Sequence, residues 1–484
     1  MPKIPYRVIY NQDCSHLFGR TKEKLTPAHV DQMVDEVAQG GADLMLINPN
    51  CQRVSYPSKV WQNYWDGLES DTGQMDDSDR AIVKQLKSLA DQGCNYLARA
   101  LQRCRQVDIA AGVSVRMNDT HRTPWPDHPF LSDFFRQHPE WQLPGNYMSF
   151  GPYKVIRALD YRRPEVREHY LKLIRELVSD YSFEVLEIDF MRSPHFFPQD
   201  TADLYCEVMT GFVREVRRLL PAGMSLQARV PVTPAAGCDL GLDAAAWAQE
   251  HLVDAIVVTA HFNTAWDMDI GAFRQLVGDD IVIYAGAEFW GYCFEGIQGI
   301  MGLDEGLLRG FAAAQYAGGA DGIYIFNFFV SQEYGRDPLF AALGQLRDPD
   351  SLQGKPKTYC LMAGGIDGLY TGDGPFQVPR LAPLGRPQAF DIFIGSEPAG
   401  QPVKVEIIVE GNVVDVMEKC RIHINEFSIG KAASIRPAVP AGSAKELQAV
   451  EFLATSDMLR PGSNRFVFRN DGEPLTVVQL LVNV

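Results

Sequence analysis

Short apolar runs alternate with helical spacing of apolar residues between residues 6 and 329. Runs such as YRVIY (6–10) and ADLMLINPN (42–50) are nearly continuous in apolar residues, which is typical of strands buried on both faces. Six further strands are predicted at 108–117, 183–192, 224–230, 254–262, 281–289 and 321–329. Helices are predicted between them, at 26–39, 80–106, 164–181, 203–220, 242–251, 270–277 and 305–317.

This alternation predicts an α/β fold, a (β/α)8 TIM barrel over residues 1–345. An open, doubly wound sheet is the alternative, and the count of eight units favours the barrel. No G-x-G-x-x-G motif follows the first strand, so a dinucleotide-binding half is not supported. The sequence also contains no P-loop and no H-E-x-x-H motif.

The pattern changes after residue 345. Residues 346–384 are rich in Gly, Pro and Asp, and we expect a linker or an irregular crossing there. From residue 385 to 484 the chain shows short strands separated by Gly, Pro and Asn turns, as in VKVEIIVEG and NRFVFRND. This region is predicted to be a smaller, all-β sandwich that forms an accessory domain.

Composition narrows the class of protein. The 484 residues include 45 Lys+Arg and 61 Asp+Glu, giving a net charge of −16 that argues against nucleic acid as the main partner. No apolar run is long enough to span a membrane, and none of the nine cysteines forms a C-x-x-C pair.

The first residues lack the apolar stretch of a signal peptide, so a cytoplasmic protein is expected; a periplasmic or secreted protein whose leader has been removed is the alternative. The sequence leaves a homo-oligomer open.

Polar residues at the carboxyl ends of the strands are the candidate site, because barrel enzymes build their active sites at that face. Asp189 and Glu288 each close a strongly apolar strand, and a carboxylate is costly there unless it has partners at the barrel mouth. Glu187 faces the same way as Asp189 in a regular strand, where it either tunes Asp189 or pairs with an arginine. The substrate-binding candidates are Asp13, Asn48, Arg116, Asn118, His121, Glu187, Arg192, Arg229, His261, Trp290 and Asn327.

Two carboxylates facing each other across a barrel mouth suit glycoside hydrolysis, in which one protonates the leaving oxygen and the other attacks or activates water. Their separation would distinguish retention (~5–5.5 Å) from inversion (~6.5–9.5 Å). The alternative reading is structural, with each carboxylate held in a salt bridge to a neighbouring arginine. The arginines at the mouth also hint at a carboxylated or sulfated sugar.

Metal-dependent chemistry is the main rival. His16, His121 and His261 could converge with the two carboxylates, but no H-x-H motif closes the first strand, as a binuclear amidohydrolase-type site requires. We therefore expect neither a metal nor another cofactor. A metal-dependent lyase or isomerase, and a carbohydrate-binding barrel without turnover, remain as alternatives.

Two segments resemble the glycosyl-hydrolase-like barrel proteins: HPEW at 138–141, and ALDYRRPEVREHYLKLIRELVSDYSFEVLEIDFMRSP at 158–194. The positions that match that family's pattern are Pro164, Glu165, Val166, Arg167, Tyr181, Asp189, Arg192 and Pro194. The resemblance implies a carbohydrate-active barrel with the fourth-strand Asp189 at its site, and hence an enzyme that cleaves an oligo- or polysaccharide.

The resemblance does not settle which carboxylate is the acid. Clan-A glycosidases also place carboxylates on strands four and seven, but they end the fourth strand with Asn-Glu, where this chain has Ile188-Asp189. In one version Glu288 is the nucleophile and Asp189 the acid/base. In the other, Asp189 is the nucleophile or base and Glu288 is the acid.

Overall fold

A computed structural model describes most of the chain. It covers residues 6–13, 16–21, 23–68, 75–144, 156–260, 264–288, 290–292, 301–302, 304–326, 328, 330, 339–362, 377–378, 380–413, 415–438 and 446–484. For residues 16, 20, 290–292, 301–302 and 339 only the backbone is considered.

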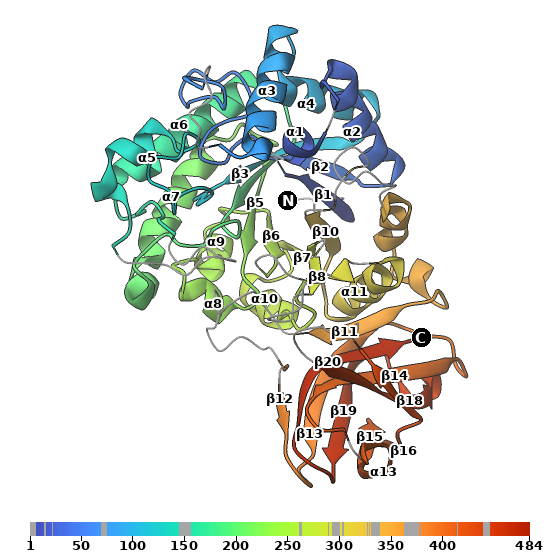
Figure 1. The fold of residues 1–484 in the computed structure, drawn as a ribbon. Coiled ribbons are helices and arrows are strands. Elements are labelled where there is room, and N and C mark those ends of the chain that lie inside the picture. Colours follow the sequence, from blue (N-terminus) through green and yellow to red (C-terminus); the bar gives the residue numbers. More distant parts are fainter. Residues whose placement is uncertain are drawn as a thin grey trace.

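Eight parallel strands close into a barrel, which confirms the predicted fold (Figure 1). Each strand pairs in register with its neighbours in chain order, and the last returns to the first. The strands are β1 (Val8–Gln12), β2 (Leu44–Ile47), β3 (Ala110–Arg116), β4 (Val185–Asp189), β5 (Ser225–Val230), β6 (Ala255–Val258), β7 (Val282–Glu288) and β10 (Gly322–Phe326). All eight lie within the predicted strand segments or overlap them.

Helices surround the barrel (Figure 1). The longer ones are α2 (Pro27–Gln39), α3 (Asp77–Asp91), α4 (Tyr96–Gln106), α6 (Pro164–Asp180), α7 (Cys206–Leu219), α9 (Ala244–Gln249), α10 (Ile270–Val277) and α11 (Glu305–Ala317). Further helical segments are the short α-helices α1 (His16–Arg20), α5 (Asp133–Gln137) and α8 (Pro234–Cys238) and the 3₁₀ segments η1 (Pro139–Trp141), η2 (Gln199–Tyr205), η3 (Leu339–Arg347) and η4 (Asp350–Leu352). Among the described residues, no helix combines the length and the apolar character that crossing a membrane requires.

One predicted helix is wrong: residues 80–106 form two helices, α3 and α4, and not one. Gly93 between them has a φ of +70°, in the left-handed region that glycine adopts most easily. The Asn95 side chain then accepts a hydrogen bond from the amide of Ala98 (3.1 Å) and so begins α4 as its N-cap. A turn glycine followed by an Asn cap therefore interrupts a continuous helical pattern.

The barrel interior changes from apolar to polar toward the carboxyl ends of the strands. Its lower part is a buried apolar cluster that includes Leu44, Val185, Val257 and Tyr284. Above it, strand register aligns first Ser114, Glu187 and Gln227, and then, two residues further along each strand, Arg116, Asp189 and Arg229. A spacing of two returns to the same face of a strand, so two polar layers follow one another inside the barrel.

The C-terminal region consists of antiparallel sheets, as predicted. One sheet runs in the order β11-β20-β14-β18-β17 with β12 beside β20, and a second runs β13-β19-β15-β16. Their bounds are β11 (Thr358–Met362), β12 (Arg380–Ala382), β13 (Gln388–Ile394), β14 (Pro402–Glu410), β15 (Cys420–Ile424), β16 (Phe427–Lys431), β17 (Ser434–Pro437), β18 (Leu447–Thr455), β19 (Gly462–Asn470) and β20 (Leu475–Asn483). The sheets form the β-sandwich, drawn in orange to red next to α11 in Figure 1.

The segment expected to be a linker, 346–384, already contributes strands to this sandwich. Both β11 and β12 pair with β20, more than ninety residues later in the chain. Helix α11 packs closely on β11, because a Cβ added at Gly310 would lie 2.0 Å from the carbonyl oxygen of Thr358. The sandwich is thus packed on the barrel through a glycine contact, although composition alone indicated an irregular crossing.

A site at the carboxyl end of the barrel

Glu187 lies at the centre of the lower polar layer and is fully buried. Its Oε1 accepts hydrogen bonds from Ser114 Oγ (2.6 Å), Asn11 Nδ2 (3.0 Å) and the Tyr324 hydroxyl (2.9 Å). Its Oε2 accepts one from Gln227 Nε2 (2.6 Å). Four neutral donors from four other strands therefore hold this carboxyl group. The sequence had suggested an arginine as its partner if the role of Glu187 is structural.

The pKa of Glu187 is raised to about 7. Burial is the largest cause, and the nearby charge of Asp189 raises it further, whereas Arg229 and the hydrogen bonds lower it. The like-charge interaction expected between Glu187 and Asp189 is thus one cause of the raised pKa of Glu187. The Glu187 carboxyl group therefore gains or loses its proton near neutral pH.

Asp189 and Glu288 are joined by a single guanidinium group. Arg229 donates from Nη1 to Asp189 Oδ2 (2.9 Å) and from Nη2 to Glu288 Oε1 (3.3 Å). The other oxygen of Asp189 accepts the backbone amides of Met191 (2.9 Å) and Arg192 (3.1 Å). All three bridged side chains are at most 2% exposed. The ends of β4, β5 and β7 therefore form one buried, charged cluster.

Aromatic and hydroxyl groups hold this cluster in place. The Arg229 guanidinium lies over the rings of Phe326 (4.4 Å) and Tyr324 (5.4 Å), and its Nη2 reaches Thr259 Oγ1 (3.4 Å). Burial would lower the pKa of Arg229, but the neighbouring carboxylates raise it, so the group stays charged. Thr264 fixes the backbone of Glu288, accepting from its amide (3.0 Å) and donating to its carbonyl (2.8 Å).

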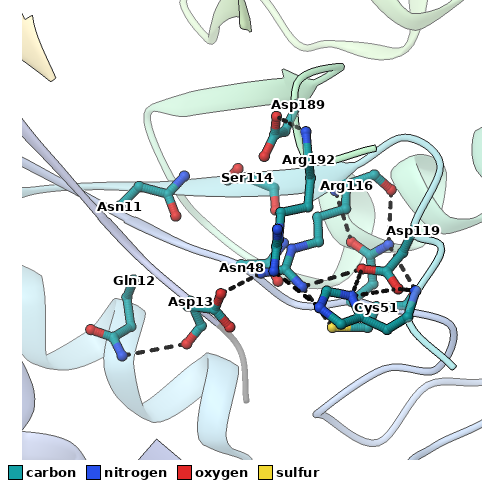
Figure 2. A network of polar contacts seen from close by, with 12 residues as sticks. Asn11, Gln12, Asp13, Asn48, Cys51, Ser114, Arg116, Asp119, Asp189 and Arg192 are labelled. Atoms are coloured by element: carbon teal, nitrogen blue, oxygen red, sulfur yellow. Dashed lines mark hydrogen bonds and ion pairs between the residues drawn. The ribbon is translucent and has the colours of Figure 1, made fainter. Parts of the chain in front are cut away.

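A second arginine organises the neighbouring part of the mouth, near β1 and β3 (Figure 2). Arg116 donates from Nη2 to Asp13 Oδ2 (2.7 Å) and from Nη1 to Asp119 Oδ2 (3.2 Å), and its Nη1 lies 2.8 Å from Cys51 Sγ. Burial would raise the pKa of Asp119, but His121 and Arg116 hold it well below its usual range. Each of these two buried arginines thus bridges two carboxylates.

His121 and Arg192 contact each other at the rim of the same cluster. Arg192 Nη2 lies 3.0 Å from His121 Nε2, and His121 Nδ1 lies 2.8 Å from Asp119 Oδ2. Because the guanidinium can only donate, Nε2 accepts and the ring proton is on Nδ1, facing Asp119. The His121 side chain is 47% exposed, so this imidazole is open to a ligand from solvent.

Three buried amide oxygens in the barrel accept no hydrogen bond within the described part of the chain: Asn11 Oδ1, Asn48 Oδ1 and Gln227 Oε1. Their orientations are set by their own amino groups, since Asn48 Nδ2 donates to the Ser114 carbonyl (2.6 Å) and the other two donate to Glu187. A buried acceptor without a donor is costly, and a ligand hydroxyl or a water molecule would satisfy it.

The structure brings together most of the residues that the sequence singles out. Asp189, Arg229 and Glu288 form one cluster, Asp13 and Arg116 form part of another, and His121 contacts Arg192. Asn118 has a different place: its amide pairs with the backbone of Leu159, at 2.9 Å and 3.1 Å, and so anchors the loop that follows β3. His261 and Asn327 lie outside the described residues, and Trp290 is described only as part of the short strand β8 (Trp290–Tyr292).

Sequence reasoning missed several residues that hold Glu187, and it missed Cys51 beside Arg116. Ser114, Gln227 and Tyr324 are polar positions within largely apolar strands, each two residues before another inward-facing residue, namely Arg116, Arg229 and Phe326. That spacing was the available signal, because it places them on the inner face. Cys51 gave no comparable signal, since it lies 65 residues before Arg116, the last residue of β3 that it contacts.

One group of side chains in the described ranges has ligand atoms suited to a metal. Ligand atoms of Cys51, Asp119 and His121 all lie within 4.8 Å of one another. However, Arg116 contacts both the thiol and the carboxylate, so a positive charge already occupies the space between them. In this arrangement the residues fit an arginine-centred cluster better than a divalent cation, and neither Asp189 nor Glu288 belongs to the group.

No protein-family model matches the chain, and no curated protein matches its sequence. Several solved structures are similar to it. An α-L-fucosidase from Paenibacillus thiaminolyticus has a TM-score of 0.45 and 10% identity, over 71% of this chain and 49% of that protein. The PgaB glycoside hydrolase domain from Bordetella bronchiseptica has a TM-score of 0.45 and 10% identity, over 71% of this chain and 98% of that domain. A GH36 α-galactosidase from Geobacillus stearothermophilus has a TM-score of 0.40 and 12% identity, over 93% of this chain and 55% of that enzyme.

All three of these proteins are named as glycoside hydrolases or glycosidases. This chain spans about half the length of the fucosidase it matches. The fold assignment rests on the strand pairing of the barrel itself.

Proposed function

We propose that this protein is a glycoside hydrolase whose reacting groups are Asp189 and Glu288. One observation carries the proposal: a single buried arginine, Arg229, holds the two acidic side chains that end β4 and β7 at the carboxyl end of a closed barrel. Two acids held across a barrel mouth are the arrangement that cleavage of a glycosidic bond needs. A carbohydrate is accordingly the substrate class we assign.

The hydrogen bonds favour different roles for the two acids. Asp189 accepts three hydrogen bonds through both oxygens, which is the environment of a carboxylate that stays negative. It is therefore assigned as the nucleophile, or as the base that activates water. Glu288 has the longer contact with Arg229, at 3.3 Å, and is assigned as the acid, a role in which it is protonated while Arg229 stays paired with Asp189. In the reaction its proton moves to the glycosidic oxygen as the carbon–oxygen bond breaks, while Asp189 acts at the anomeric carbon.

The polar layer beneath supports this assignment. The amide oxygens of Asn11, Asn48 and Gln227, which have no donor within the described residues, can accept hydrogen bonds from the hydroxyl groups of a sugar. His121 stands at the rim with 47% of its side chain exposed, and its ring, whose two nitrogens contact Asp119 and Arg192, offers a ligand its open face. These groups are assigned to substrate binding rather than to bond cleavage.

The test is product release from a broad panel of oligosaccharides and polysaccharides, read by mass spectrometry. Wild type, Asp189→Asn and Glu288→Gln are compared with and without a chelator. Glu250→Gln serves as the matched control, because Glu250 pairs with Arg214 on the surface. We expect cleavage of at least one glycan, a loss of about 10²–10⁴-fold in each site variant, and no effect of the control or the chelator. No cleavage anywhere in the panel would contradict the proposal.

A second function is favoured by the same cluster. Arg229 engages both acids, as it would in a purely structural salt bridge, and this suits a carbohydrate-binding barrel without turnover. Binding of a glycan by wild type, unchanged in Asp189→Asn and with no products released, would support that alternative. Activity that the chelator abolishes would instead support a metal-dependent lyase or isomerase.

A further inference from the structure

Two thiols on the outside of the barrel lie against each other. Cys206 is the first residue of α7 and Cys238 is the last residue of α8. The Cys206 Sγ lies 3.9 Å from the carbonyl oxygen of Cys238, and the two thiol groups are close enough to influence each other's pKa. Both are free thiols, and Cys238 is exposed.

This pair differs from the other cysteines that the structure describes. Cys51, Cys94, Cys104, Cys360 and Cys420 are all buried free thiols. Buried cysteines of this kind serve mainly as small apolar groups. Only the Cys206–Cys238 pair combines a neighbouring thiol with access to solvent among the described residues.

We propose that Cys206 and Cys238 form a reversible disulfide, and that this pair is a covalent modification site responsive to peroxide. The proposal concerns the outer surface of the barrel and does not depend on the glycosidase assignment. It requires two neighbouring thiols, one of them accessible; here the Cys206 thiol lies against the backbone of Cys238, and Cys238 is exposed.

The two cysteines are suited to different steps. The hydrogen bond from Cys206 lowers the pKa of Cys238 to about 7, against the opposing effects of burial and of Asp243, Asp239 and Asp203. The same contact, together with burial, raises the pKa of Cys206. Of the two thiols, Cys238 is therefore the one that ionises more readily, and the thiolate is the nucleophile in thiol chemistry.

The reaction proceeds in two steps with hydrogen peroxide as the oxidant. The Cys238 thiolate attacks one peroxide oxygen, the O–O bond breaks, and the departing hydroxide takes a proton to become water, which leaves Cys238 as a sulfenic acid. The Cys206 sulfur then attacks the Cys238 sulfur, the S–O bond breaks, and a second water leaves with the Cys206 proton. In total, two thiols and one peroxide give one disulfide and two water molecules.

The bond would join two segments that leave neighbouring barrel strands. Cys206 follows β4, which ends at Asp189, and Cys238 follows β5, which carries Arg229. The two cysteines are 32 residues apart in the chain, so the disulfide closes a loop of that length in the unfolded state. Closing such a loop stabilises the folded state, and we expect the oxidised protein to unfold at a higher temperature.

The experiment treats the reduced full chain, under native conditions, with increasing amounts of hydrogen peroxide. Remaining thiols are then blocked with N-ethylmaleimide, and peptides are mapped without reduction. Wild type is compared with Cys206→Ser, with Cys238→Ser and with Cys94→Ser as the control, because Cys94 is a buried cysteine elsewhere. Thermal unfolding of each reduced variant checks that it folds.

The expected result is a cross-linked Cys206–Cys238 peptide in wild type and in the control, which a dithiol reductant removes. In Cys206→Ser, oxidation should stop at the Cys238 sulfenic acid, which dimedone traps, and in Cys238→Ser the peroxide should leave Cys206 reduced. Absence of the cross-linked peptide would overturn the proposal, as would equal dimedone trapping of Cys238 in wild type and Cys206→Ser.

Discussion

Arg229 lies between two acidic side chains that would otherwise be buried without a counter-ion. Its two amino groups reach Asp189 at 2.9 Å and Glu288 at 3.3 Å, and all three side chains are almost fully buried. Removing one partner of a buried ion pair leaves an uncompensated charge, which costs far more than the pair itself contributes. At the residue scale, this one side chain therefore sets both the stability of the mouth and the position of the proposed reacting groups.

Substitution of Arg229→Gln should destabilise the protein by about 3–5 kcal/mol. The measurement is urea-induced unfolding followed by circular dichroism at neutral pH. The matched control is Arg214→Gln, whose partner Glu250 lies on the surface at 2.8 Å, and this variant should lose much less stability because solvent screens the pair. Equal losses of unfolding free energy in the two variants would contradict the claim that burial makes the Arg229 ion pairs costly to break.

The pKa of Glu187 predicts a dependence of stability on pH. Because burial and Asp189 raise the pKa from 4.5 to about 7, the folded protein keeps a proton that the unfolded chain releases in this range. The contribution of Glu187 to the free energy of unfolding is thus fully present below about pH 4.5 and is lost as the pH rises to about 7.

Glu187→Gln removes this titration while keeping the shape of the side chain. The difference in unfolding free energy, wild type minus variant, should fall between pH 4.5 and pH 7 and become constant above it. Denaturant unfolding at a series of pH values measures it, and comparison with the variant cancels other groups such as Asp267, whose pKa burial also raises. A difference that stays flat or rises across this range would contradict the assigned shift.

At the residue scale, the sequence indicated which side chains lie together at the mouth where a charged side chain ended an apolar run. Asp189 and Glu288 were found on that basis, and Arg229 was found as a strand-end residue. Their mutual contacts were not predictable, because Arg229 is 40 residues from Asp189 and 59 from Glu288, and the pairing depends on barrel register. The layer around Glu187 was missed for the same reason, since each of its donors comes from a different strand.

At the scale of elements, the contact between α11 and β11 depends on a missing side chain. A Cβ at Gly310 would meet the Thr358 carbonyl oxygen at 2.0 Å and its carbon at 2.5 Å, and both are backbone atoms. Gly211 in α7 offers a comparison, because a Cβ there would meet only the end of the Arg214 side chain, at 3.9 Å.

Gly310→Ala should therefore destabilise the protein by about 1–3 kcal/mol through overpacking. Gly211→Ala should instead stabilise it by about 0.5–1 kcal/mol, because alanine favours a helix where space permits. Denaturant unfolding of both variants gives the two values. If both substitutions change the free energy of unfolding in the same direction, the close packing of α11 on β11 does not explain why residue 310 is a glycine.

The elements themselves were largely readable from the chain. Continuous apolar runs identified all eight barrel strands, because such strands are buried on both faces. The break at Gly93 and Asn95 was overlooked because helical spacing continues on both sides of it. The strands β11 and β12 were hidden in a segment rich in Gly, Pro and Asp, and their partner β20 lies at the far end of the chain.

At the scale of the whole molecule, the barrel supplies the rigid frame and the sandwich covers one side of it. Strand register places Arg116, Asp189 and Arg229 at one level, so the mouth is assembled by the same pairing that closes the barrel. The sandwich packs beside α11 (Figure 1), on the outer side of the barrel wall. The proposed reacting groups therefore all belong to the barrel.

Hydrolysis in water enriched in oxygen-18 tests the central claim most directly. A glycan that the wild type cleaves is incubated in this water, and the products are read by mass spectrometry. The account predicts one heavy oxygen at each new reducing end, and no such product from Asp189→Asn or Glu288→Gln. Unsaturated products without the heavy oxygen, or labelled products that persist in both variants, would contradict the claim that these two carboxylates cleave a glycosidic bond with water.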